Sequence, residues 1–123
     1  MIVGTEWLVE AEGCDPAKLR DEYAMRRVID RAIAELGLHP IGSVWHTFPA
    51  KGGVTGLVAL TESHLACHTY PEHAVATFNL YCCRTRPEWD WDTELRNELG
   101  ARRVMITRVD RGTRSSAKVA GSQ

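Results

Sequence analysis

The sequence predicts an α+β fold in which an antiparallel β-sheet carries two helices packed on one face. Three observations lead to this class. Short segments alternate β-branched or aromatic residues with polar ones, two longer segments have apolar residues at helical spacing, and turn-forming residues separate neighbouring strands. The 123 residues are enough for a modest core and too few to divide into two, so a single domain is expected over residues 1–123.

The first third of the chain is expected to form a strand followed by a helix. Residues 2–11 alternate β-branched, aromatic and polar residues, which suits a strand with one wet face. Asp15 and Pro16 suit the N-cap and first position of a helix, and Gly37 suits its end. The helical stripe between them consists of Leu19, Tyr23, Met25, Val28, Ile29, Ala32, Ile33 and Leu36.

The middle of the chain is expected to be rich in strands, because runs of β-forming residues are separated by short segments that contain Pro or Gly. The runs over residues 41–48 and 54–60 are predicted to form a hairpin. The strands are expected over residues 41–48, 54–60, 65–70 and 74–83, with turns at 49–53 and 71–72.

The last third is expected to hold the second helix and a final strand. Residues 87–99 have aromatic and leucine side chains at helical spacing and precede Gly100, a stop signal, and residues 103–109 return as a strand. The order of elements suggests two similar halves, each an antiparallel portion of the sheet with one helix on it. The Ser-, Gly-, Lys- and Arg-rich segment 112–123 is expected to be a disordered tail.

The composition indicates small-molecule or protein partners. The net charge of -1, from 15 basic and 16 acidic residues, leaves no electrostatic footprint for nucleic acid or for an anionic membrane. No apolar run approaches the roughly 20 residues of a membrane helix, and the N-terminus lacks the features of a signal peptide. The four cysteines are therefore interpreted as thiols, and the cytoplasm is the expected compartment.

Residues 61–72, together with the Cys82-Cys83 pair, concentrate nucleophiles, bases and a carboxylate in the middle of the chain. This is the one segment whose composition indicates chemistry. A metal-binding module is one interpretation, although the spacing of the possible ligands matches no standard zinc pattern. These possible ligands are His64, Cys67, His68, His73, Cys82 and Cys83.

The segment contains, in order, Glu62-Ser63-His64-Leu65, His68-Thr69, Pro71-Glu72 and Cys83. At this spacing it resembles the processing and active-site segment of the pyruvoyl-dependent S-adenosylmethionine decarboxylases, in the short prokaryotic form that is made as a proenzyme. The resemblance extends over most of the chain and is strongest over residues 53–83. It implies the decarboxylase-like version of the predicted fold.

The resemblance implies that the protein breaks its own Glu62–Ser63 bond. In the family the serine oxygen attacks the preceding carbonyl, an ester forms, and base-promoted elimination opens the chain, here into a β chain of residues 1–62 and an α chain of residues 63–123. Ser63 would become a pyruvoyl group, a ketone that forms a Schiff base with the substrate amine. Such a cofactor requires neither a metal nor pyridoxal phosphate.

The resemblance also assigns expected roles to individual side chains. His68 matches the proton acceptor of processing, and Thr55 keeps the hydroxyl of a serine that is common in the family. Cys83 matches the proton donor of decarboxylation, and Cys82 stays open as an alternative because the strand register is not known from sequence. The expected substrate contacts are Glu72 with the ribose, Tyr70 and Phe48 with the adenine, and Leu65 and Glu10 as further binding residues.

The expected reaction converts S-adenosylmethionine to its decarboxylated form, the aminopropyl donor for spermidine synthesis. The resemblance implies a homodimer of αβ units with active sites near the subunit boundary. Related members decarboxylate arginine or ornithine, and Tyr70, where bacterial relatives often have Trp, leaves that alternative open. A further alternative is an unprocessed, non-catalytic paralogue.

Overall fold

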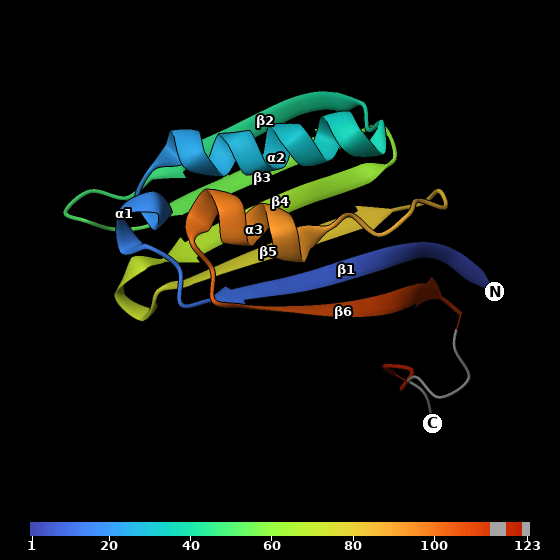
Figure 1. The fold of residues 1–123 in the computed structure, drawn as a ribbon. Coiled ribbons are helices and arrows are strands. Elements are labelled where there is room, and N and C mark those ends of the chain that lie inside the picture. Colours follow the sequence, from blue (N-terminus) through green and yellow to red (C-terminus); the bar gives the residue numbers. More distant parts are fainter. Residues whose placement is uncertain (114–117, 122–123) are drawn as a thin grey trace.

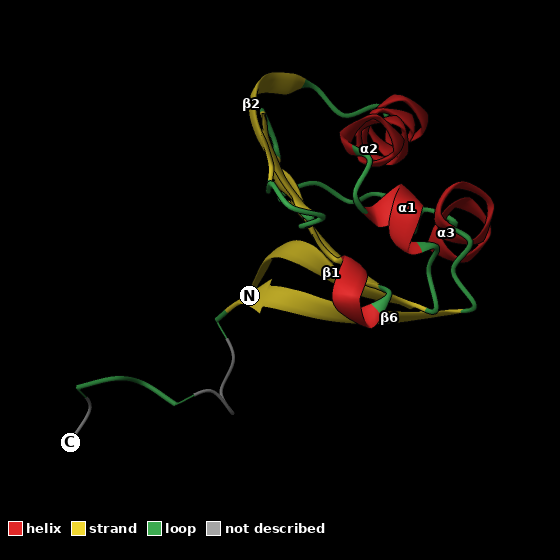
Figure 2. Ribbon diagram, turned by 90° about the vertical axis from the view of Figure 1, so that its left-hand side faces the viewer, coloured by secondary structure: helices red, strands yellow, loops and turns green. Residues whose placement is uncertain are grey.

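The computed structural model describes residues 1–113 and 118–121 and has two layers, a six-stranded sheet and a set of helices on one of its faces (Figures 1 and 2). All neighbouring strands are antiparallel, so the predicted α+β class is confirmed. The elements are β1 (Ile2–Glu12), α1 (Pro16–Leu19), α2 (Glu22–Leu36), β2 (Pro40–Thr47), β3 (Val54–Leu60), β4 (Ser63–Tyr70), the 3-10 turn η1 (Pro71–His73), β5 (Val75–Cys82), α3 (Trp91–Leu99) and β6 (Arg103–Gly112).

The strand order is β2-β3-β4-β5-β1-β6, which places β1 between the two last strands of the chain. Residues Thr5 to Ala11 of β1 pair with β5, and its other edge pairs with β6 along nearly its whole length. The prediction of two similar halves, each with its own portion of the sheet, is therefore wrong. The first strand pairs with strands that are distant in sequence, a relation that no local pattern reports.

The single helix expected from Pro16 onwards is divided into α1 and α2. Asp15 accepts a hydrogen bond from the backbone N–H of Ala17, and Asp21 accepts another from that of Tyr23, so each aspartate caps its own helix. Tyr23, expected in the apolar stripe, is 74% exposed. The later helix starts at Trp91 and not at residue 87, because the Asp90 carboxylate caps it through the N–H of Thr93.

The core lies between the helices and one face of the sheet (Figure 2). Alternate residues along β1, β3, β4 and β5 point into it, as the period of a strand requires. α2 and α3 cover this face with a set of fully or almost fully buried side chains. They are Ala24, Met25, Val28, Ile29, Ala32, Leu36, Trp91, Leu95 and Leu99.

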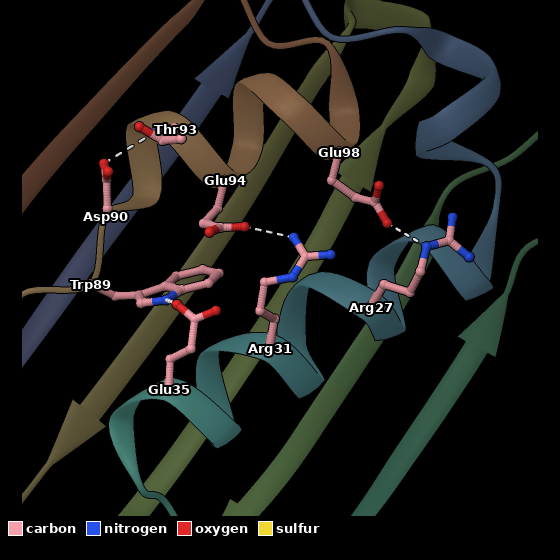
Figure 3. Close-up of polar contacts among 8 residues, drawn as sticks. All are labelled: Arg27, Arg31, Glu35, Trp89, Asp90, Thr93, Glu94 and Glu98. Atoms are coloured by element: carbon pink, nitrogen blue, oxygen red, sulfur yellow. Dashed lines mark hydrogen bonds and ion pairs between the residues drawn. The ribbon is translucent and has the colours of Figure 1, made fainter.

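Polar contacts join α2 to α3 above this core (Figure 3). Arg31 lies 2.6 Å from Glu94, and Arg27 forms an ion pair with Glu98. The indole N–H of Trp89, in the loop before α3, donates to Glu35 at 2.8 Å. Partly exposed ion pairs contribute little stability, so these contacts orient the two helices while the buried side chains beneath them supply most of the free energy.

The opposite face of the sheet is open, and within residues 1–113 no helix covers it (Figure 2). Apolar side chains are exposed there, including Val44 at 69% and Leu57 at 46%. No helix among the described residues is long and apolar enough to cross a membrane.

The last strand extends further than expected. Gly112, predicted to begin the disordered tail, is paired with Ile2 at the end of β6. Its φ of 140° and its close approach to the backbone of Met1 suit a residue without a side chain. Residues 114–117 and 122–123, half of the predicted tail, lie outside the described residues.

Replacing Leu95 by Ala is expected to lower the free energy of unfolding by about 2–5 kcal/mol, because the side chain is fully buried and its loss leaves a cavity. Urea unfolding measures the change. Asn97→Ala, at an exposed position of the same helix, is the control and should change stability by no more than about 0.5 kcal/mol. Equal effects of the two changes would contradict the packing of α3 on the sheet.

Candidate active site

A tight turn of two residues, Thr61 and Glu62, joins β3 to β4 and places the Glu62–Ser63 peptide bond at one end of the sheet. Leu60 and Ser63 face each other across the turn, and Ser63 also lies opposite Cys82 of β5. Strand β4 begins at Ser63, two residues earlier than expected, because of this pairing. The φ of Ser63 is 151°, which residues with a Cβ rarely adopt. The backbone is therefore strained at the bond that the sequence singles out.

The side chain of Glu62 is buried and held by three neighbours. Thr61 donates its hydroxyl at 2.9 Å, His39 Nδ1 lies 3.2 Å away, and Arg86 Nη2 donates at 2.8 Å. The bonds from Thr61 and then His39 outweigh the effect of burial and lower the pKa of Glu62 to about 2. Its carboxylate is therefore ionised at neutral pH and fixes the conformation of the turn.

The two adjacent cysteines have different surroundings. Cys82 has no exposed surface on the core side of β5, and burial raises the pKa of its thiol to about 11. Cys83 is exposed, and its backbone N–H donates to the carbonyl oxygen of Glu62 at 3.0 Å. Of the two thiols, Cys83 is thus the accessible one, and its backbone contacts the carbonyl that Ser63 would attack.

His64 is the side chain that contacts the Ser63 hydroxyl. Its Nδ1 lies 3.0 Å from Ser63 Oγ, and its Nε2 lies 3.1 Å from Oδ1 of Asn79. The sequence pattern singled out His64 only within the motif and as a possible metal ligand, and it gave no role to Asn79 or Arg86. Strand alternation, which places His64 and Asn79 on the open face, was the available signal.

A second group of predicted site residues lies toward the other end of β4. His68 Nδ1 is 2.7 Å from Thr55 Oγ1 across the β3–β4 ladder. The His68 ring contacts those of Tyr70 and Phe48, with centroids 4.6 Å and 6.1 Å apart. Glu72 follows in the exposed turn η1. The structure therefore brings an imidazole, a hydroxyl and two aromatic rings together, with a carboxylate two residues further on.

The two groups do not meet within one chain. Ser63 and His68 are five residues apart on one extended strand, so at about 3.3 Å per residue their Cα atoms are about 17 Å apart. Glu72 lies beyond the far end of the same strand. Residues that are close in the motif are therefore distant in space, and His68 cannot reach Ser63 of its own chain.

Between the two groups the open face has a hollow of ≈ 290 Å³, lined among others by Glu10, His68, Thr77 and Asn79. Glu10, expected from sequence to contact the substrate, thus lies on the open face beside this hollow. Leu65 does not, because its side chain has no exposed surface and packs in the core. Binding of substrate by Leu65 therefore stays a prediction, and with the side chain in the core such a contact would have to come from its backbone.

The interpretation as a metal-binding module has no support in the part of the chain that the structure describes. Among those residues no group of three or more His, Cys, Asp and Glu side chains is placed to hold an ion. All four cysteines are free, and three of them are buried.

Comparisons with known proteins agree with the motif. The model of the S-adenosylmethionine decarboxylase family matches residues 5–112. A protein of Prochlorococcus marinus strain MIT 9313 named S-adenosylmethionine decarboxylase proenzyme is 38% identical over 114 residues, which cover 91% of this chain and 90% of that protein. An arginine decarboxylase proenzyme of Aeropyrum pernix is 37% identical over 114 residues, 90% of this chain and 86% of its own.

A solved structure supports the same relationship. The crystal structure of the adenosylmethionine decarboxylase from Aquifex aeolicus VF5 matches with a TM-score of 0.75 and 25% identity, covering 96% of this chain and 98% of that one. The match therefore includes both the helical layer and the whole sheet.

The contacts of Glu62 predict a pH dependence of stability. Because its folded pKa is lowered from 4.5 to about 2, Glu62 stabilises the fold above pH 4.5, and this contribution is lost as the pH falls toward 2. Arg86→Gln is expected to lower the melting temperature of the uncleaved chain by several degrees at pH 7 and by less at pH 2.5.

Thermal unfolding of a Ser63→Ala background, in which the chain should stay intact, measures this difference. Arg84→Gln, in the same loop but exposed, is the matched control and should change the melting temperature little at either pH. A loss for Arg86→Gln that is equal at both pH values would show that the Glu62 carboxylate is not its partner.

Proposed function

The chain belongs to the S-adenosylmethionine decarboxylase family, and on this basis we propose that it cleaves itself between Glu62 and Ser63 and then decarboxylates S-adenosylmethionine. The observation that carries the proposal is the geometry of that bond. Ser63 has a strained φ, and the N–H of Cys83 donates to the carbonyl oxygen of Glu62. The product would be the aminopropyl donor for spermidine synthesis.

In the proposed cleavage, Ser63 Oγ attacks the carbonyl carbon of Glu62. Negative charge develops on the carbonyl oxygen, where the Cys83 N–H already donates, so this donor stabilises the transition state. The C–N bond then breaks, which leaves Glu62 as an ester on Ser63 Oγ and frees the amine of Ser63. Removal of the Ser63 Cα proton expels the Glu62 carboxylate, and hydrolysis with loss of ammonia leaves a pyruvoyl group at residue 63.

The surroundings of residue 63 fit such a group. The position is partly exposed, and the exposed Cys83 is fixed beside it through the hydrogen bond to Glu62. The pyruvoyl carbonyl would condense with the substrate amine and accept electrons as carbon dioxide leaves. Cys83 Sγ would hold the proton that the substrate carbon then receives. Cys82 is a poor alternative, because it faces the core and burial raises its pKa to about 11.

A second copy of the chain would supply the residues that lie too far from Ser63. The open face of the sheet, with its exposed apolar side chains, is the surface on which a homodimer of αβ units would form. In that dimer His68, held by Thr55, would take the Ser63 Cα proton. Glu72 would bind the ribose hydroxyls, and Tyr70 and Phe48 would stack on the adenine.

Arginine or ornithine is the second candidate substrate. The observation that favours arginine is the 37% identity to a relative named arginine decarboxylase proenzyme. Such an enzyme would keep Ser63, His68 and Cys83 and differ around Tyr70 and Phe48. No metal or pyridoxal phosphate is needed for either substrate, and the cytoplasm is the proposed compartment for a protein whose four cysteines are free.

Ser63→Ala is expected to abolish both cleavage and decarboxylation, because it removes the attacking oxygen and the precursor of the ketone. Intact-mass spectrometry should find fragments of residues 1–62 and 63–123 in the unmodified protein and only the whole chain in the variant. Ser43→Ala, at an exposed position of β2, is the control and should cleave normally. A wild-type chain that stays whole would indicate a non-catalytic paralogue instead.

Release of carbon dioxide from carboxyl-labelled S-adenosylmethionine is expected to exceed that from equally labelled arginine or ornithine by at least about 100-fold, the discrimination typical of a site built around one ligand. Freshly processed protein should be used, since the assay needs the pyruvoyl group. Release of carbon dioxide from arginine or ornithine alone would support the pyruvoyl chemistry but would mean that the pocket around Tyr70 and Phe48 binds an amino acid and not a nucleoside.

A further inference from the structure

A chain of hydrogen bonds crosses four strands of the open face and ends at the Ser63 hydroxyl. Ser63 Oγ lies 3.0 Å from His64 Nδ1, and His64 Nε2 lies 3.1 Å from Asn79 Oδ1. Asn79 Nδ2 donates to one oxygen of Glu6, and Arg111 donates to the other. These residues belong to β4, β5, β1 and β6, which are neighbours in the sheet.

The direction of every bond in this chain follows from its far end. An ionised carboxylate can only accept, so the Asn79 amide presents its N–H to Glu6 and its oxygen to His64. In the neutral imidazole of His64, Nε2 then carries the hydrogen, and Nδ1 faces the Ser63 hydroxyl with a free lone pair. Although burial opposes it, hydrogen bonds from Asn79 and Arg111 lower the pKa of Glu6, which keeps its carboxylate ionised.

We propose that His64 is the general base for the first step of self-cleavage, a role that rests on the processing proposed above. His64 Nδ1 accepts the proton of Ser63 Oγ as the bond to the Glu62 carbonyl carbon forms. It returns that proton to the Ser63 nitrogen as the peptide C–N bond breaks. The proton taken from the hydroxyl is thus returned to the nitrogen, and formation of the ester needs no other proton donor or proton acceptor.

Asn79 and Glu6 act as positioning residues through His64. The Asn79 oxygen stabilises the imidazolium that forms when His64 takes the proton, and Glu6 fixes the orientation of the Asn79 amide. The Tyr81 ring, whose centroid lies 5.8 Å from that of His64, limits the rotation of the imidazole. The base is thus preorganised before the reaction begins.

This assignment divides processing between two histidines. His68 bonds to Thr55 and lies about 17 Å along the strand from Ser63, so within one chain it cannot activate the hydroxyl. His64 contacts the reacting oxygen directly and needs no second copy. The ester can therefore form in a single chain, whereas removal of the Cα proton waits for the other histidine.

Hydroxylamine separates the two steps, because it cleaves esters and leaves amides intact. Precursors of the full chain should be followed by intact mass with and without hydroxylamine. His64→Gln is expected to slow the loss of precursor by at least about 100-fold, the usual contribution of a general base, and hydroxylamine should not accelerate it. His68→Gln should instead accumulate ester, which hydroxylamine cleaves to an α chain that still begins with Ser63.

His73→Gln, in the exposed turn η1, is the matched control and should process like the unmodified protein. His64→Ala is a second test of the same role. Added imidazole should restore cleavage of this variant if the missing group is a base, and it should not if His64 only supports the fold. Asn79→Ala keeps the imidazole and should cleave at a rate between those of the unmodified chain and His64→Gln.

The assignment of His64 would be overturned if His64→Gln cleaved as fast as the unmodified protein. It would also be overturned if His64→Gln accumulated as much ester as His68→Gln. Failure of imidazole to restore cleavage in a folded His64→Ala chain would have the same consequence. A wild-type precursor that never cleaves would instead refute the proposed self-processing, so the two failures are distinguishable.

Discussion

The buried carboxylate of Glu62 is the contact on which the rest of the site depends. Thr61, His39 and Arg86 hold it, and these three contacts anchor the turn between β3 and β4. Directly after this turn Ser63 has its unusual φ, and the Glu62 carbonyl accepts a hydrogen bond from the N–H of Cys83. The anchored side chain therefore lies next to the strained backbone of Ser63, at the bond where cleavage is proposed.

The fold was largely predictable because its elements have strong local signals. The alternation along β3 gave its exact limits, and the stripe that ends at Gly37 gave the main helix. The break at Asp21 was missed, since one continuous stripe concealed a second capping residue. The place of β1 between β5 and β6 was not predictable, because pairing between distant strands depends on tertiary packing and not on any local pattern.

The site was predictable in its parts and not in its arrangement. The motif identified Glu62, Ser63 and Cys83, which the structure brings together around one peptide bond. The same motif assigned His68 a role in processing, but it did not show that the extended strand separates His68 from Ser63 of its own chain. The hydrogen-bond network that links Glu6 of β1 and Asn79 of β5 to Ser63 depends on the register of the sheet, which cannot be read from a single sequence.

The position of β1 has a consequence for the proposed cleavage. If the Glu62–Ser63 bond is broken as proposed, β1 belongs to one polypeptide and both strands that flank it belong to the other. The first polypeptide also contributes α2 to the core that α3 of the second completes. Separation of the two would require the simultaneous loss of three β-ladders, β1–β5, β1–β6 and β3–β4, together with the packing of α2 and α3 in the common core. The cleaved protein would thus be an interlocked pair of polypeptides that should neither dissociate on dilution nor exchange with those of other molecules.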